Sequence, residues 1–160
     1  MPTAFMSYSW DSPLHKQWVK KLATDLIGME INVLLDEWEV PLGGDLAEFM
    51  EKGISKSDRV LMVCTDNYLA RANDGNGGGV PYEKLIVRAE LIAKMDSAKF
   101  VPVIRDQVAE PAIPRFMGLR RYLDLRDDNH YDAALEELAR DIYGLSTKPA
   151  LGKNPFRGEE

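Results

Sequence analysis

The sequence is poor in the residues that build covalent cross-links and metal centres. Its 160 residues include one cysteine, Cys64, and two histidines, His15 and His130. A single cysteine excludes an internal disulfide and a cysteine-rich metal site, and it is typical of a reducing compartment. The histidines lie far apart, and neither has a second His or Cys at the spacing of metal ligands. We therefore expect no bound metal, surface positions for both histidines, and a buried, unreactive thiol.

Several common ligand-binding motifs and targeting segments are also missing. The chain has neither a G-x-x-x-x-G-K-[ST] phosphate loop nor a G-x-S-x-G nucleophile turn. Its glycine run 75–79 is followed by Val80, where a dinucleotide-binding motif requires its third glycine. No apolar run approaches the roughly 20 residues of a membrane span, and the N-terminus lacks a basic-then-apolar signal peptide. We expect a cytoplasmic protein with no membrane partner and no cofactor.

What is present is the composition of an ordinary globular domain. With 45% hydrophobic and 29% charged residues, the chain can bury one core. Its net charge of −6 argues against a direct nucleic-acid partner, since binding to phosphates requires clustered Lys and Arg. Residues 146–160 contain prolines and glycines without periodicity. We expect a domain over 1–145, then a tail or linker that leads to a further, sensor domain.

Predicted strands and helices alternate along the domain. Continuous apolar runs predict buried strands at 3–7, 31–35, 59–65, 100–104 and 121–125. The helix after Ser12 has an apolar face with a four-residue spacing, made of Leu14, Trp18, Leu22 and Leu26. Asp45 is placed to cap a second helix, Pro81 opens a third, and residues up to Leu145 line a last one. This alternation predicts an α/β, flavodoxin-like three-layer sandwich, with helices on both faces of a five-stranded parallel sheet.

Polar loops follow the predicted strands at 8–12, 36–44, 66–80 and 105–115. In parallel sheets the carboxyl ends of the strands share one edge, and ligands bind there. A phosphoryl receiver domain has this topology and needs an acidic cluster with a lysine. Asp11, Asp36 and Asp66 supply acids, but Arg105 stands where the lysine is required. The receiver hypothesis therefore fits poorly, although it stays open.

Glu83 is the leading candidate for a reactive side chain. It follows the glycine run 75–79 and stands two residues after Pro81, in the expected first turn of a helix. The helix dipole there favours an ionised carboxylate, which can stabilise positive charge that develops in a substrate. The alternative is that Glu83 only stabilises its helix. Glu90, two turns further on, is the second candidate, and its alternative is a solvated position on the same helix away from the cleft.

Three segments in this order resemble one family. They are FMSYSWD after the first strand, LLDEWEVPLGGDL after the second, and SDRVLMVCTDNYL around the third. Over residues 3–145 the chain resembles a bacterial TIR (Toll/interleukin-1 receptor) domain of the NAD-cleaving type, with a glycine insertion like that of the related SEFIR group. The resemblance implies the cytoplasmic, flavodoxin-like fold already predicted.

The resemblance also implies two alternative functions. Many bacterial and plant members cleave the nicotinamide–ribose bond of NAD+ with one glutamate near the start of the third helix, and Glu83 falls at that position. The chain would then be an NAD+ nucleosidase that releases ADP-ribose or its cyclic form in anti-phage defence, activated by self-association. Other members are non-catalytic adaptors that bind other TIR domains. Both uses involve the second segment, called the BB loop, here Glu39, Val40, Pro41, Leu42 and Gly43.

The other predicted substrate contacts are side chains of the strand-end loops around Glu83. Many relatives carry Trp-Cys four and three residues before the glutamate, where this chain has Gly79 and Val80; Tyr82, Trp10 or Trp38 would then supply the aromatic face. The remaining candidates are Ser7 and Ser9, for phosphate or ribose oxygens, and Asp36, which either binds ribose or braces its loop. Trp10 alternatively packs on the first helix, and Trp38 either covers the ligand, contacts a neighbouring subunit or packs on the second helix. Asn67 and Tyr68 are expected in a turn.

Overall fold

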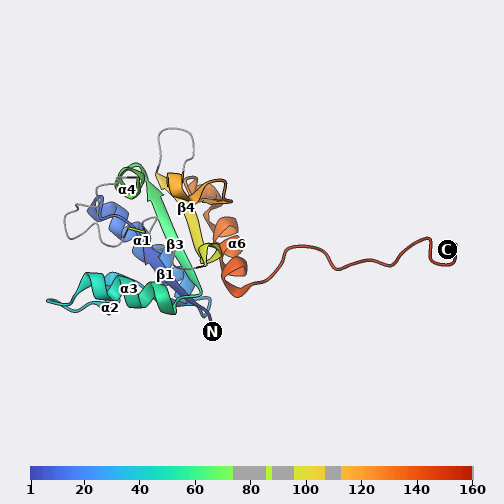
Figure 1. Ribbon diagram of the computed structural model, residues 1–160, viewed down its shortest axis with the longest axis horizontal. Coiled ribbons are helices and arrows are strands. Elements are labelled where there is room, and N and C mark those ends of the chain that lie inside the picture. Colours follow the sequence, from blue (N-terminus) through green and yellow to red (C-terminus); the bar gives the residue numbers. More distant parts are fainter. Residues whose placement is uncertain (74–85, 88–95, 107–112, 160) are drawn as a thin grey trace.

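The computed structural model describes residues 1–73, 86–87, 96–106 and 113–159 (Figure 1). Five strands form one parallel sheet in the order β2-β1-β3-β4-β5. The strands are β1 (Thr3–Ser7), β2 (Asn32–Leu34), β3 (Arg59–Thr65), β4 (Phe100–Asp106) and β5 (Leu123–Asp124). This confirms the predicted α/β, flavodoxin-like sheet.

Helices cover both faces of the sheet. They are α1 (Pro13–Ile27), α2 (Asp36–Glu39), α3 (Leu46–Lys56), α4 (Asp66–Ala72) and α6 (Tyr131–Tyr143), with short 3₁₀ turns at Ser97–Lys99, Arg115–Met117 and Asp128–His130. Right-handed crossovers place α1 on one face and α3 on the other. The start of α6 meets α1, because the Tyr131 hydroxyl donates to Asp25 at 2.6 Å. The sheet thus forms the middle of three layers.

Local sequence signals explain where the helices start. The Ser12 side chain accepts from the backbone N–H of His15, and Pro13 opens α1. Asp45 accepts from the N–H groups of Ala47 and Glu48, which confirms it as the cap of α3. These side chains satisfy backbone donors that have no partner inside the helix.

Three sequence expectations were wrong in detail. Leu14 is 78% exposed, whereas Leu22 and Leu26 are buried as expected, together with Val19 and Ala23. A spacing of four turns about 40° beyond a full helical turn at each step, so Leu14 lies about 80° around the helix from Leu22. The second and fifth strands are shorter than 31–35 and 121–125, and Leu145 lies beyond α6 with 57% exposure. The helix expected after Pro81 lies outside the described residues.

The core lies on both sides of β1 and β3. Every residue of β3 after Arg59 is buried, including Cys64, as a strand covered on both faces requires. On the α3 side, Gly53 packs directly against the ring of Phe5, which also contacts Phe49 at a centroid distance of 5.1 Å. The described tail, 146–159, is exposed and extends away from the domain (Figure 1). In the described part of the chain, no helix is long and apolar enough to cross a membrane.

Candidate ligand-binding site at the strand ends

A cluster of polar side chains lies where β1 and β3 end. Ser9 Oγ donates to Asp11 Oδ1 at 2.5 Å and lies 3.3 Å from Thr65 Oγ1. Asn67 Nδ2 donates to the same Asp11 oxygen at 2.9 Å. Because β1 and β3 are neighbours in the sheet, loops more than fifty residues apart in sequence meet here. The predicted meeting of polar loops at this edge is therefore found for the first and third strands.

Tyr68 joins this edge to the segment that follows Glu83 in sequence. Its hydroxyl lies 2.8 Å from Ser7 Oγ and accepts from the backbone N–H of Val87 at 3.3 Å. All three residues are fully buried. The expectation of a turn at Asn67 and Tyr68 was wrong, because Thr65 caps α4 and both residues lie in its first turn. Ser7 is placed to hold Tyr68, and the structure offers no support for its predicted contact with substrate.

Glu83 and Tyr82 lie outside the described residues, as does Glu90, and their predicted roles stay predictions. The nearest described residues, Ile86 and Val87, are buried in the core. Val87 stands four residues after Glu83 and is fastened to Tyr68. The chain on the C-terminal side of the predicted catalytic residue is therefore anchored beneath the ends of β1 and β3.

Asp36 is held at the end of β2 by a buried hydrogen bond. The Tyr8 hydroxyl donates to Asp36 Oδ1 at 2.6 Å, and both side chains are almost fully buried. Burial raises the pKa of the Asp36 carboxyl, and the bond from Tyr8 partly counteracts that rise. Burial, together with the neighbouring Asp36 carboxylate, raises the pKa of Tyr8 as well. This geometry supports Asp36 as a brace for its loop, and its predicted contact with ribose stays a prediction.

Trp10 lies partly buried beside the polar cluster. The Lys16 ammonium stands 4.7 Å from the centroid of its ring, so a cation already occupies an aromatic surface here. The ring packs against the hydrophobic core and remains partly open to solvent. Trp10 therefore combines the packing role with an exposed edge, and the predicted stacking on a ligand stays a prediction.

The BB-loop segment is a solvent-facing projection. This segment, residues 36–44, comprises α2, in which Trp38 is 38% exposed, and the BB loop at 39–43, in which Leu42 is fully exposed. Gly43 has a φ of 83°, a backbone conformation that side chains other than glycine rarely adopt, and so permits the turn. A groove of about 420 Å³ lies between this segment and α3, with Val40, Pro41 and Phe49 among its lining residues. Exposed apolar side chains beside a groove fit the expected interface role of this segment.

Sequence reasoning missed a stack of side chains next to this edge. The His15 ring is parallel to Trp18 at a centroid distance of 6.4 Å, and the Arg105 guanidinium stands 4.3 Å over the Trp18 ring. His15 is partly buried, which corrects its predicted surface position, whereas His130 is exposed as expected. Burial lowers the pKa of His15, and no described residue bonds its buried Nε2. The three-residue spacing of His15 and Trp18 on one helix was the signal available in the sequence.

The acids at the strand ends do not form a receiver-type site. Asp36 is bonded to Tyr8, while Asp11 is bonded to Ser9 and Asn67. Among the residues that the structure describes, no group of three or more His, Cys, Asp or Glu side chains could hold a metal ion. Arg105 instead bonds the backbone oxygen of Leu125 and the Asp128 carboxylate.

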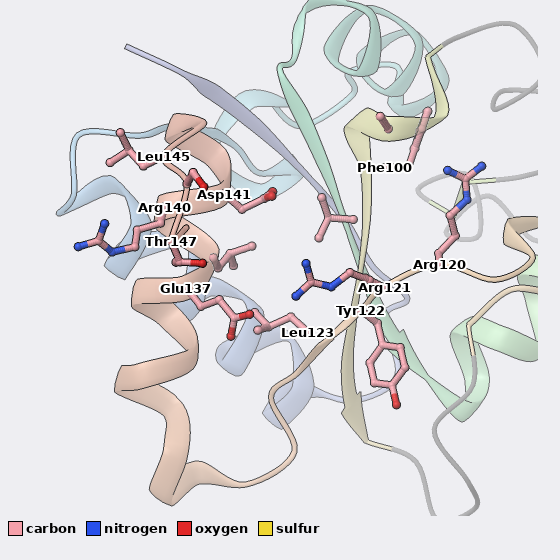
Figure 2. A pocket seen from close by; sticks show the side chains of 14 residues that line it. Phe100, Arg120, Arg121, Tyr122, Leu123, Glu137, Arg140, Asp141, Leu145 and Thr147 are labelled. Carbon is pink, nitrogen blue, oxygen red and sulfur yellow. The ribbon is translucent and has the colours of Figure 1, made fainter. Parts of the chain in front are cut away.

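A second groove of about 420 Å³ lies near the starts of β4 and β5 (Figure 2). Phe100 and Leu123, the first residues of β4 and β5, line it together with the C-terminal half of α6. Figure 2 shows the Arg121 side chain extending towards α6, whereas Arg120 turns away from it. Tyr122 and side chains of both charges also line this groove, which shares no residue with the polar cluster at the strand ends.

The fold and this edge define a flavodoxin-like α/β domain with polar side chains gathered at the ends of its central strands. The model of one family, the TIR domain, matches residues 5–139. The chain therefore belongs to the TIR domain family.

Solved structures agree with this assignment. A prokaryotic SEFIR domain is 34% identical, with a TM-score of 0.77, over 99% of this chain and 100% of that one. The TIR domain of the Toll-related receptor TRR-2 from Hydra magnipapillata is 18% identical, with a TM-score of 0.61, over 89% and 99% of the two chains. The TIR domains of the activated Roq1 resistosome, which recognises the effector XopQ, are also 18% identical, with a TM-score of 0.63 and the same coverage. No curated protein matches the chain.

Proposed function

We propose that this domain cleaves the nicotinamide–ribose bond of NAD+, with Glu83 as the catalytic carboxylate. Water replaces nicotinamide on the ribose, and the products are nicotinamide, ADP-ribose and a proton; attack by a base of the same molecule would give cyclic ADP-ribose. The bond breaks through an oxocarbenium-like transition state with positive charge on the ribose. An ionised carboxylate lowers that barrier electrostatically or by a transient covalent bond, as in retaining sugar hydrolysis.

The observation that carries this proposal is the arrangement of the strand ends. Asp11 and Asn67 supply exposed carboxylate and amide groups beside the partly exposed Trp10 ring, and the buried Ser9 hydroxyl holds Asp11 in place. Such groups suit ribose hydroxyls and a stacked base. The Tyr68–Val87 bond anchors the chain that follows Glu83 at the same edge. We further propose that copies self-associate through 39–43 and that association activates the enzyme in bacterial defence.

The test is nicotinamide release measured over a range of protein concentrations. We expect Glu83→Gln to lower the turnover by about a hundredfold or more, as the loss of an electrostatic stabiliser does. Glu136→Gln is the control, because Glu136 is an exposed glutamate of α6 that lies outside both the polar cluster and the groove beside the BB-loop segment. If both variants keep wild-type turnover, Glu83 has only a helix-stabilising role and Glu90 is tested next.

One observation favours a non-catalytic interaction module as the second candidate. The BB-loop segment exposes Leu42 fully and Trp38 partly beside a groove, and a surface of this kind suits protein recognition. Absence of turnover in the wild type, even at concentrations where the protein self-associates, would favour this function. In that case Leu42→Asp is expected to weaken association, whereas Glu83→Gln is not.

A further inference from the structure

Tyr8 connects two loops to which the proposed function gives different roles. It directly follows β1 and precedes Ser9 and Trp10, while its hydroxyl reaches Asp36, the first residue of α2. Residues 28 positions apart are thus joined by a 2.6 Å bond that is shielded from solvent. Burial prevents water from replacing this bond.

Lys16 makes a second, weaker connection between the same two loops. Its ammonium stands 4.7 Å from the Trp10 centroid and 3.8 Å from Glu37 Oε1 in α2, and Lys20 lies 3.6 Å from Glu37 Oε2. Partly exposed ion pairs contribute little to stability. A ring that stacks on the same surface of Trp10 would nevertheless displace Lys16 and shift its pairing with Glu37.

We propose that Tyr8 is a positioning residue that holds the Trp10 loop and the root of the BB-loop segment together as one unit. Movement of residues 8–12 on ligand binding is then transmitted to 36–44 through the Tyr8–Asp36 bond. The identity of the ligand, NAD+, and of the partner, a second copy, rests on the proposed function. Ligand binding and self-association through 39–43 are then linked, and the linkage acts equally in both directions.

Backbone hydrogen bonds in α2 supply a direct readout. The N–H groups of Trp38 and Glu39 bond the Leu35 oxygen, and that of Val40 bonds the Asp36 oxygen, at 2.9–3.0 Å. Amide hydrogen exchange at 38–40 therefore measures how often this segment opens.

The experiment compares exchange at 38–40 in the full chain and in matched variants. Tyr8→Phe removes the bond, and we expect exchange at 38–40 to rise about tenfold. Tyr131→Phe is the control, because it removes a tyrosine–aspartate bond of the same 2.6 Å length between α6 and α1, outside both loops, and it should leave 38–40 unchanged. Asp36→Asn keeps an oxygen acceptor for Tyr8 but loses the second carboxylate oxygen, so it should raise exchange less than Tyr8→Phe does. Asp36→Leu removes the acceptor while keeping Tyr8, and should reproduce the effect of Tyr8→Phe.

A second arm adds millimolar NAD+ and separates this inference from the proposed function. We expect NAD+ to slow exchange at both 8–12 and 38–40 in the wild type, but only at 8–12 in Tyr8→Phe. Equal exchange at 38–40 in Tyr8→Phe and Tyr131→Phe would overturn the inference, as would wild-type protection confined to 8–12. Faster exchange at 38–40 in Tyr8→Phe, with no effect of NAD+ on the wild type, would support the link between the loops and refute the proposed substrate.

Discussion

The buried hydroxyl of Tyr68 allows a sharp test of how this edge of the sheet is held. Replacing Tyr68 with Phe removes its bond to Ser7 Oγ at 2.8 Å and the acceptor for the Val87 N–H at 3.3 Å. A typical internal hydrogen bond contributes about 1 kcal/mol, and a buried donor left without its acceptor costs about 1–3 kcal/mol. Val87 and Tyr68 are fully buried, so water cannot take over these bonds. We expect the free energy of unfolding to fall by about 2–3 kcal/mol.

Tyr143→Phe is the matched control for this prediction. The Tyr143 hydroxyl also has two partners, the backbone oxygens of Met29 at 2.7 Å and Glu30 at 2.9 Å, but the residue is 42% exposed. Water can bond those oxygens once the hydroxyl is removed. We expect a loss below about 1 kcal/mol for this variant.

Urea unfolding followed by circular dichroism provides the comparison, with an unchanged m-value showing that both variants unfold from compact native states. For a chain of this size the expected loss in Tyr68→Phe corresponds to about 4–12 °C in melting temperature. Equal midpoints for Tyr68→Phe and Tyr143→Phe would show that burial does not set the cost of losing these bonds, since both hydroxyls have two partners.

Two further predictions concern the core. Gly53→Ala places a Cβ 2.6 Å from the Phe5 ring. We expect the cost of overpacking, about 1–3 kcal/mol, to outweigh the gain in helix propensity, about 1 kcal/mol, so the protein should be less stable. The control, Ser55→Ala on the exposed face of the same helix, should change the urea midpoint little. Burial raises the pKa of Cys64 from 9.0 to about 12, so a disulfide reagent at pH 8 should label the thiol only after unfolding. Since the unfolded chain loses this proton first, stability should fall above about pH 9 by up to about 1.4 kcal/mol per pH unit, and Cys64→Ala should remove that contribution from a series of melting curves at rising pH.

Patterns local to a segment predicted the local structure well. The β-branched and apolar runs predicted the strands, and the side chain of Asp45 predicted the start of α3, because both signals act within a few residues. The first turn of α4 was missed although Thr65 supplies its cap, since the polar residues after it are equally typical of turns. The exposed position of Leu14 was missed because an apolar residue in a helix is not bound to face the core.

The predictions for the candidate site also succeeded where they depended on local patterns. The resemblance in the three sequence segments correctly identified the family, and strand alternation alone indicated which loops share an edge. Residue types in the loops at 8–12 and 36–44 suggested Ser9, Trp10 and Asp36, but they did not show which of these side chains are accessible.

What the sequence by itself determined was the order of the five strands and of the helices α1, α3 and α6, the family and the identity of the candidate residues, because periodicity, capping and motifs are properties of neighbouring positions; α2 and α4 were expected as parts of loops. Only the tertiary structure decided which side chains meet. The Tyr8–Asp36 and Ser7–Tyr68 bonds join residues 28 and 61 positions apart. The parallel sheet brings the ends of distant strands to one edge, and burial then decides which polar groups there bond each other and which stay open to a ligand.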